Sequence, residues 1–191
     1  MEEGREKQQK QEYMNVKEMT KIGMMVAVLC VISPFSFPLP FSPVPISLSS
    51  LAIFLTVYVL GMKRGTFSCF VYILIGTVGV PVFSGFSGGV HKLMGPTGGY
   101  IIGYLFLAVV SGFFVEKWRK QKILHLCGMA LGTVLLYGFG TVWLAEQGGL
   151  SFQEALLVGV VPFVLGDVAK IGISFIIGNL IYGRLRKAGV L

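Results

Sequence analysis

The sequence is short of charge, and carboxylates are the scarcest charged groups. Charged residues occupy 13% of 191 positions, and Asp167 is the only aspartate. An average soluble domain carries roughly 25% charged residues. Hydrophobic residues reach 54% and mean hydropathy is +0.77, so water could not solvate the apolar surface of such a chain. We therefore interpret it as an integral membrane protein.

Cysteine is also scarce. Cys30, Cys69 and Cys127 are odd in number, widely spaced and placed inside apolar stretches. This pattern excludes a disulfide framework and fits no zinc site. We expect the three thiols to be buried small hydrophobic groups.

Common catalytic motifs are missing as well. The sequence contains no G-x-x-x-x-G-K-[ST] loop, no H-E-x-x-H motif and no Ser/His/Asp set, so we expect no ATP binding by that route. Its two histidines, His91 and His125, are expected on opposite sides of the membrane. We predict that the chain is not an enzyme and has no cofactor or metal.

Six apolar blocks follow a charged N-terminal segment at 1–21. Each is long enough to approach a membrane span of about 20 residues, and a chain in lipid must satisfy its backbone groups within helices. We expect an all-α bundle of six transmembrane helices over 22–191. The blocks run over 22–37, 46–62, 65–83, 98–115, 123–145 and 155–183.

The basic residues set the orientation. The net charge is +7. The sequence has no pattern of basic and aromatic residues that would indicate nucleic-acid binding. With six helices threaded alternately, 14 of the 16 Lys and Arg residues fall on one side, while Lys92 is the single one opposite and Lys170 lies in the sixth block. The positive-inside rule then places both termini in the cytoplasm.

Two of the expected outward links have unusual compositions. The segment 38–45, "PLPFSPVP", holds four prolines, which favour an extended, stiff chain. The segment 84–97, "SGFSGGVHKLMGPT", is rich in glycine and small residues.

Asp167 and Lys170 stand inside the sixth block. A charge at the bilayer centre costs about 2.5–3.5 kcal/mol on insertion scales, and positions three apart share a helix face. We expect both side chains to point into the bundle. They form either a structural ion pair between helices or a binding site for a small ligand with both N–H donors and a carbonyl.

The segment "GPTGGY" at 95–100 begins the fourth block. A helix N-terminus carries unpaired N–H groups and partial positive charge, and Gly98 and Gly99 would let an anionic group approach the backbone. Lys92 lies just upstream. The alternative is a tight turn with close helix packing at the two glycines.

Aromatic residues are expected near the outer helix ends, where they serve either as interfacial anchors or as walls of a pocket. They are Phe83, Phe86, Tyr100, Tyr137 and Trp143. In the first block, Gly23 and Ala27 have the small-xxx-small spacing that allows close helix approach. This stripe serves either packing within the bundle or docking to another membrane subunit.

Three segments together resemble the BioY family, the biotin-binding S components of energy-coupling-factor (ECF) transporters. They are "PVPISLSSLAIFL" at 43–55, "GVPVFSGFSGGVHKLMGPTGGYIIGY" at 79–104 and "GDVAKI" at 166–171. The resemblance covers nearly the whole chain after residue 20. It agrees with six helices and cytoplasmic termini.

The resemblance implies high-affinity biotin uptake by a multi-pass protein of a prokaryotic plasma membrane. In this family Asp167 and Lys170 would contact the ureido ring, the loop 84–97 would close over the ligand, and Tyr100 would line the pocket. The first helix of the family meets a membrane coupling subunit through an Ala-xxx-Ala pattern, whose first position is Gly23 here and whose second is Ala27. Two partner ATPases would supply the energy.

The chemistry of these residues suits biotin. Asp167 can accept ureido N–H groups and Lys170 can donate to the carbonyl, while aromatic side chains pack the ring. Lys92, with the amides near Gly98 and Gly99, is the candidate for the carboxylate on charge. Three alternatives are an S component for another small anionic vitamin, a solitary biotin transporter, and an assembly protein whose Asp–Lys pair only joins helices.

Overall fold

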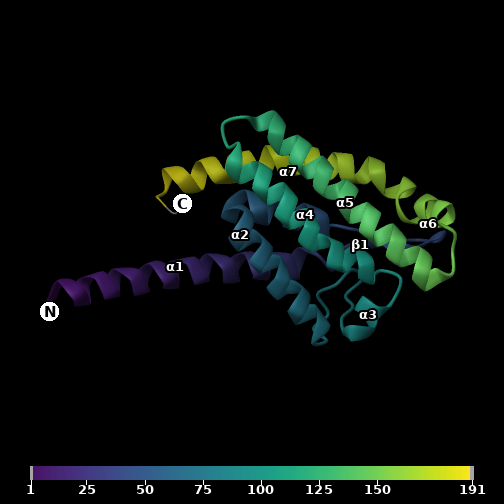
Figure 1. Cartoon of the computed structure of the whole chain (residues 1–191), viewed down its shortest axis with the longest axis horizontal. Coiled ribbons are helices and arrows are strands. Elements are labelled where there is room, and N and C mark those ends of the chain that lie inside the picture. Colours follow the sequence, from purple (N-terminus) through teal and green to yellow (C-terminus); the bar gives the residue numbers. More distant parts are fainter. Residues whose placement is uncertain (1, 190–191) are drawn as a thin grey trace.

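The computed structural model describes the backbone of residues 2–189 and the side chains of residues 16–189. Over this range the regular secondary structure is helical apart from one short hairpin, and loops join the elements (Figure 1). The elements in chain order are α1 (Glu2–Ile32), β1 (Ser36–Leu39), β2 (Ser42–Ser47), α2 (Ser49–Thr77), α3 (Val90–Met94), α4 (Gly98–Lys117), α5 (Lys122–Gly148), α6 (Phe152–Gly159) and α7 (Val161–Lys187).

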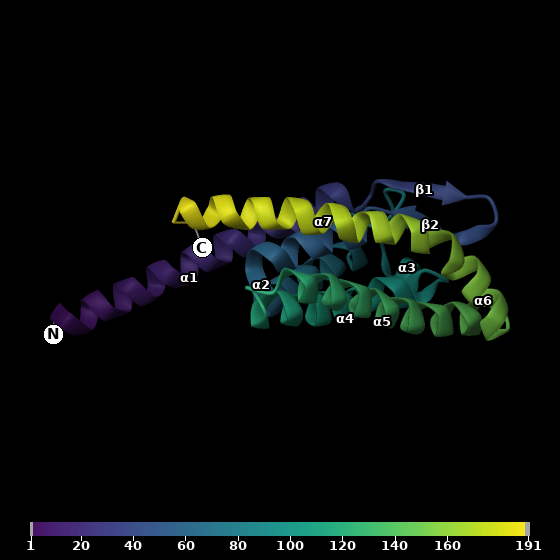
Figure 2. The same cartoon turned by 90° about the horizontal axis from the view of Figure 1, so that it is seen from above.

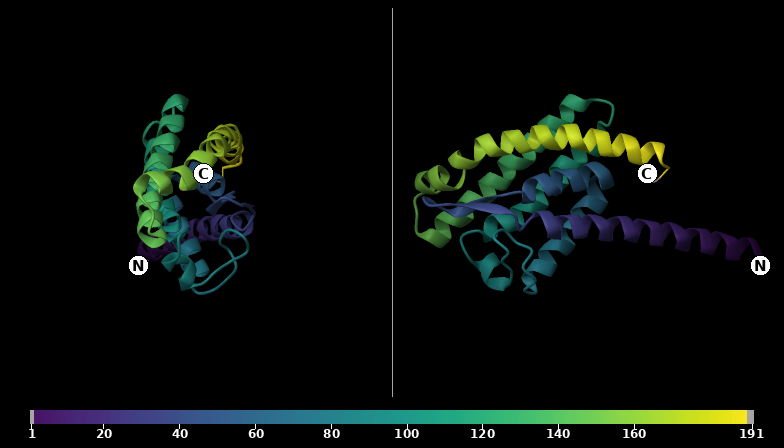
Figure 3. Two further views of the ribbon diagram at one scale, coloured as in Figure 1. Left: turned by 90° about the vertical axis from the view of Figure 1, so that its right-hand side faces the viewer. Right: turned by 180° about the vertical axis from the view of Figure 1, so that it is seen from behind.

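The helices form a bundle with two different ends. The strands β1 and β2 and the short helices α3 and α6 gather at one end, which we call the hairpin end, whereas both chain termini lie toward the other (Figures 1 and 2). Helix α4 packs between α2 and α5, and α1 and α7 pack against α2. The first half of α1 extends beyond the other helices (Figure 3).

Four of these helices, α2, α4, α5 and α7, are long and apolar enough to cross a membrane. Their outward side chains are apolar, as at Leu165, Val168 and Ile176 of α7. The expectation of a helical membrane protein is therefore confirmed. Helix α1 falls outside this group because the apolar stretch within it, residues 22–32, is shorter than a membrane span of about 20 residues.

The second and third predicted blocks form one kinked helix, α2. Gly61 interrupts it with φ 78° and ψ −172°, a conformation that is essentially restricted to glycine. The two limbs come into close contact beside the kink. A Cβ added to Gly65 on the second limb would lie only 3.0 Å from the Cα of Val57 on the first. The carboxylate of Glu116 accepts the N–H of Met62 at 2.8 Å, which satisfies a free donor at the start of the second limb.

Three predicted block ends were wrong, and proline explains most of the error. Helix α1 ends at Ile32 rather than at residue 37, α2 begins at Ser49 rather than at 46, and it ends at Thr77 rather than at 83. Pro34 and Pro81 lie in the residues excluded from α1 and from the end of α2, and Pro45 lies just before the predicted second block; the residue before a proline is pushed out of the helical region.

The sixth predicted block is two helices. Helix α6 starts at Ser151 with a capping box, in which the side chain of Glu154 accepts the backbone N–H of Ser151 and Ser151 accepts that of Glu154. The hydroxyl of Ser151 also donates to this carboxylate, and together with the Ser151 N–H it lowers the pKa of the exposed Glu154 carboxyl. The chain leaves the helical conformation at Val160 and restarts with Pro162 in the first turn of α7, where a missing N–H costs nothing.

The proline-rich segment is extended, as expected, and it forms the hairpin. Ser36 pairs with Ser47 and Phe37 with Ile46 in an antiparallel register. The hydroxyl of Ser42 donates to the carbonyl of Val158 at 2.7 Å. The hairpin is thereby tied to the end of α6.

The opposite end of the bundle is held by buried polar groups. The hydroxyl of Tyr58 on α2 lies 3.0 Å from Nδ1 of His125 on α5. The other ring nitrogen of His125 contacts the carbonyl of Trp118 at 3.1 Å, and Asn179 of α7 reaches the hydroxyl of Tyr58 at 3.5 Å. Three helices are joined there.

The kink in α2 yields a stability prediction. Replacing Gly61→Ala forces a side chain into a glycine-only conformation and places its Cβ 2.8 Å from the Glu116 carboxylate. We expect a cost of about 1–3 kcal/mol and a thermal midpoint in detergent lower by roughly 5 °C, measured by circular dichroism. Gly172→Ala is the control, since a Cβ there meets open space. Equal midpoints for both variants would contradict the strain.

Candidate functional site

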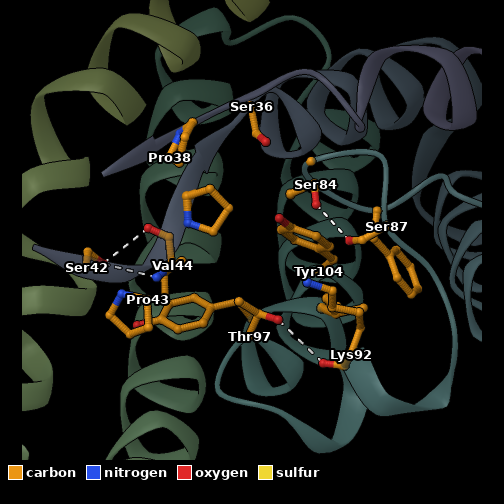
Figure 4. A pocket seen from close by; sticks show the side chains of 15 residues that line it. Ser36, Pro38, Ser42, Pro43, Val44, Ser84, Ser87, Lys92, Thr97 and Tyr104 are labelled. Carbon is orange, nitrogen blue, oxygen red and sulfur yellow. Dashed lines mark hydrogen bonds between the residues drawn. The ribbon is translucent and has the colours of Figure 1, made fainter. Parts of the chain in front are cut away.

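A cavity of about 310 Å³ opens between the hairpin and the loop that precedes α4. We call it the hairpin cavity. In Figure 4, hairpin residues such as Pro38, Ser42 and Val44 lie on one side and loop residues such as Ser84 and Lys92 on the other. Its floor comes from the face of α4 that carries Tyr100, Ile101 and Tyr104.

A second, smaller cavity of about 40 Å³ lies beside it. We call it the carboxylate cavity, because Asp167 and Lys170 line it together with residues of α2 and α5. The two cavities have four lining residues in common: Val44, Pro45, Tyr100 and Tyr104. A ligand in the hairpin cavity therefore lies one side chain away from the charged pair.

Asp167 and Lys170 are both buried, with exposed fractions of 6% and 8%. Nζ of Lys170 donates to Oδ1 of Asp167 at 2.7 Å. Ser50 of α2 reaches the same oxygen at 3.5 Å, and the hydroxyl of Tyr137 on α5 donates to Oδ2. Three helices thus supply donors to one carboxylate, which compensates for taking its charge out of water.

The helical repeat explains why both charges point inward. The buried positions of α7 recur along one stripe, while its other faces are apolar and exposed. That stripe consists of Phe163, Asp167, Lys170, Ser174 and Gly178. A helix in lipid keeps its apolar side chains outward and its polar ones inside, so the pattern of this sequence fixes the rotation of α7.

Tyr100 is held in place by glycines on two other helices. A Cβ on Gly140 of α5 would lie 2.5 Å from its ring, and one on Gly159 of α6 would lie 2.3 Å from its hydroxyl oxygen. That hydroxyl donates to the carbonyl of Gly159 at 3.0 Å. The ring is thereby fixed as a wall between the two cavities. Tyr104 follows one turn later on the same face.

The structure gives Gly98 and Gly99 a packing role. A Cβ on Gly98 would lie 1.7 Å from the carbonyl oxygen of Leu93, and one on Gly99 would lie 2.2 Å from Cβ of Trp143. The N–H of Gly98 already donates to the carbonyl of Gly95 at 3.0 Å. The indole N–H of Trp143 donates to the same carbonyl at 3.0 Å, which fixes the turn before α4.

The structure brings five of the seven predicted site residues to the two cavities. Phe83, Lys92 and Tyr100 line the hairpin cavity, and Asp167 and Lys170 line the other. Gly98 and Gly99 are absent from both sets of lining residues. They act indirectly, by allowing the close packing of the turn before α4 and of Trp143.

The predicted docking stripe lies elsewhere. Gly23 and Ala27 are exposed on α1, and a Cβ on Gly23 would meet nothing within 4 Å. Among the described side chains, the stripe is therefore not buried against another helix.

Sequence reasoning left two contributors to the site unnamed. Tyr104 could have been found, because it shares a helix face with Tyr100. The sequence around Ser50 does not indicate a role in the site. Its hydroxyl reaches Asp167 only because α2 packs against α7. Tyr137 was considered only as an aromatic wall or anchor, whereas its hydroxyl is what contacts Asp167.

The arrangement suits reversible binding of a small molecule. The hairpin cavity is near the lower end of the range of about 300–1,000 Å³ for small-ligand sites. It offers aromatic walls, one ammonium group at Lys92 and access to the buried pair. Within residues 16–189, no group of three His, Cys, Asp or Glu side chains is placed to hold a metal ion.

Comparisons with known proteins agree with one another. Residues 6–187 match the model of the BioY family. The chain is 36% identical over 175 residues to "Biotin transporter BioY" of Thermotoga maritima, covering 92% of this chain and 99% of that protein. It is 34% identical over 171 residues to "Probable biotin transporter BioY" of Pyrococcus horikoshii, covering 90% and 99%.

A solved structure has the same fold. The crystal structure of the S component for biotin from an ECF-type ABC transporter superimposes with a TM-score of 0.81 at 30% identity. The match covers 92% of this chain and 93% of that one. With the family model, the full-length relatives and this fold in agreement, the chain belongs to the BioY family.

Proposed function

We propose that this protein is the biotin-capturing S component of an ECF-type vitamin importer, a transporter subunit and not an enzyme. The observation that carries the proposal is the buried Asp167–Lys170 pair on the wall next to the hairpin cavity. The relatives named as biotin transporters and the solved biotin S component support the same ligand.

The ureido ring of biotin presents an N–H beside a carbonyl. Asp167 accepts from the N–H and Lys170, 2.7 Å from that carboxylate, donates to the carbonyl. Charge-assisted hydrogen bonds contribute about 1.5–3 kcal/mol each, so two of them with burial of the apolar ring support nanomolar binding.

The rest of the ligand fits the hairpin cavity. Phe83 and Tyr100, both buried, offer aromatic surface to the thioether ring and the alkyl chain. Lys92 is the only cation among the residues that line this cavity, so it meets the carboxylate of biotin. The loop 84–97 then lies over the bound molecule.

We propose six membrane passes, with the two limbs of α2 counted separately. Both termini lie in the cytoplasm of a prokaryotic cell, since 14 of the 16 basic residues then face inward. The hairpin end faces outward. At 1.5 Å per residue the first limb of α2 is roughly 18 Å long, less than the hydrocarbon core of about 30 Å, so the hairpin fills the remaining depth. Residues 1–21 form the charged cytoplasmic segment.

The energy comes from partners. We propose that a membrane coupling subunit and two ATP-binding-cassette ATPases complete the importer, as the family implies. The exposed stripe at Gly23 and Ala27 supports α1 as the docking helix, because small residues let another helix approach closely.

Titration with biotin tests the proposed function. We expect the purified protein in detergent to bind biotin well below micromolar concentration, measured by calorimetry. Asp167→Asn should weaken binding at least roughly 100-fold, because it removes a charge-assisted acceptor and leaves Lys170 unpaired. Lys63→Gln, a charge change at an exposed position, is the control. Folded protein that gives no heat with micromolar biotin would refute the assignment.

The role of Lys92 is tested with a neutral ligand. Replacing Lys92→Gln should weaken biotin roughly fivefold, as expected for a partly exposed ion pair of up to about 1 kcal/mol. Biotin amide, which has no carboxylate, should bind the variant and the unmodified protein equally. If both ligands lose affinity to the same extent, Lys92 does not meet the carboxylate.

A further inference from the structure

The donors around Asp167 are divided unequally between its two oxygens. Oδ1 receives Lys170 at 2.7 Å and faces the hydroxyl of Ser50 at 3.5 Å. Oδ2 receives one donor, the hydroxyl of Tyr137. A carboxylate oxygen accepts about two hydrogen bonds, so Oδ1 is filled and Oδ2 keeps one free acceptor position.

Tyr137 is placed to control that free position. It is half-buried on α5, it lines the carboxylate cavity with Asp167 and Lys170, and its hydroxyl bond joins α5 to α7. A phenol has one hydrogen to donate. While the Tyr137 hydroxyl donates to Oδ2 and Lys170 donates to Oδ1, the carboxylate is held in one orientation, and the remaining lone pair of Oδ2 has a fixed direction.

We infer that Tyr137 is a positioning residue, which orients Asp167 so that its carboxylate accepts a hydrogen bond from one ureido N–H of the ligand and not from both. This inference rests on the proposed function. The N–H is accepted at Oδ2 while the Tyr137 bond is retained, and Lys170 serves the neighbouring carbonyl. The second ureido N–H finds its acceptor elsewhere on the cavity walls. The Tyr104 hydroxyl, which lies 3.4 Å from that of Ser47 and lines both cavities, can accept it.

The test combines Tyr137→Phe with two biotin analogues, each methylated on one ureido nitrogen. We expect Tyr137→Phe to weaken biotin roughly tenfold, because the hydrogen bond to the charged carboxylate is lost. One analogue removes the N–H that Asp167 accepts. Its affinity should differ less than twofold between Tyr137→Phe and the unmodified protein, since there is no N–H left to position.

Tyr182→Phe is the matched control. Tyr182 lies on α7 at the opposite end, with its ring 4.3 Å from the guanidinium of Arg119, and loss of its hydroxyl should leave biotin affinity unchanged. Should Tyr137→Phe fail to fold, 3-fluorotyrosine at position 137 keeps the ring and makes the hydroxyl a stronger donor. Biotin should then bind as tightly or more tightly, and the methylated analogue should not change.

The outcomes separate the two claims. Failure of the unmodified protein to bind biotin overturns the proposed function and this inference with it. Biotin binding that Tyr137→Phe leaves unchanged overturns only the role of Tyr137. An equal loss for biotin and both analogues also overturns it, because a general structural defect would weaken every ligand alike.

Discussion

The structure depends on surrounding one buried carboxylate with donors inside an apolar bundle. Asp167 is surrounded by donors from α2, α5 and α7, and each of these helices must hold its position for the charge to be compensated. Breaking a buried pair by removing one partner costs about 3–5 kcal/mol. The rotation of α7, the approach of α5 and the start of α2 below the hairpin all serve this one group.

The sequence predicted the fold where local chemistry decides it. The spans α4 and α5 begin and end within a few residues of the predicted blocks, because a long apolar run in lipid can only be a helix. The hairpin pairing, the fold-back at Gly61 and the break at Val160 were not predicted. They depend on contacts between distant segments, such as Ser36 with Ser47 and Glu116 with Met62, which leave no periodic signal.

The candidate site likewise contains residues that local sequence predicts and residues whose role depends on packing between helices. Asp167 and Lys170 could be predicted because a charge inside an apolar run is costly in a membrane, so two of them indicate a buried pair or a binding site. Lys92 and Tyr100 also reach the cavity. The part of Tyr137 could not be predicted, since a tyrosine in an apolar helix has the same local pattern whether it faces lipid or a carboxylate. The packing of α5 against α7 decides between the two.

The hydrogen bonds among Tyr58, His125 and Asn179 join α2, α5 and α7 at the end of the bundle opposite the hairpin. Among the described residues, the hairpin cavity opens at one end of the bundle, and three helices are hydrogen-bonded to one another at the other. Under the proposed function, a ligand in the hairpin cavity is separated from the cytoplasmic end by these hydrogen-bonded helices, so its release into the cell requires them to move, either relative to one another or as one body.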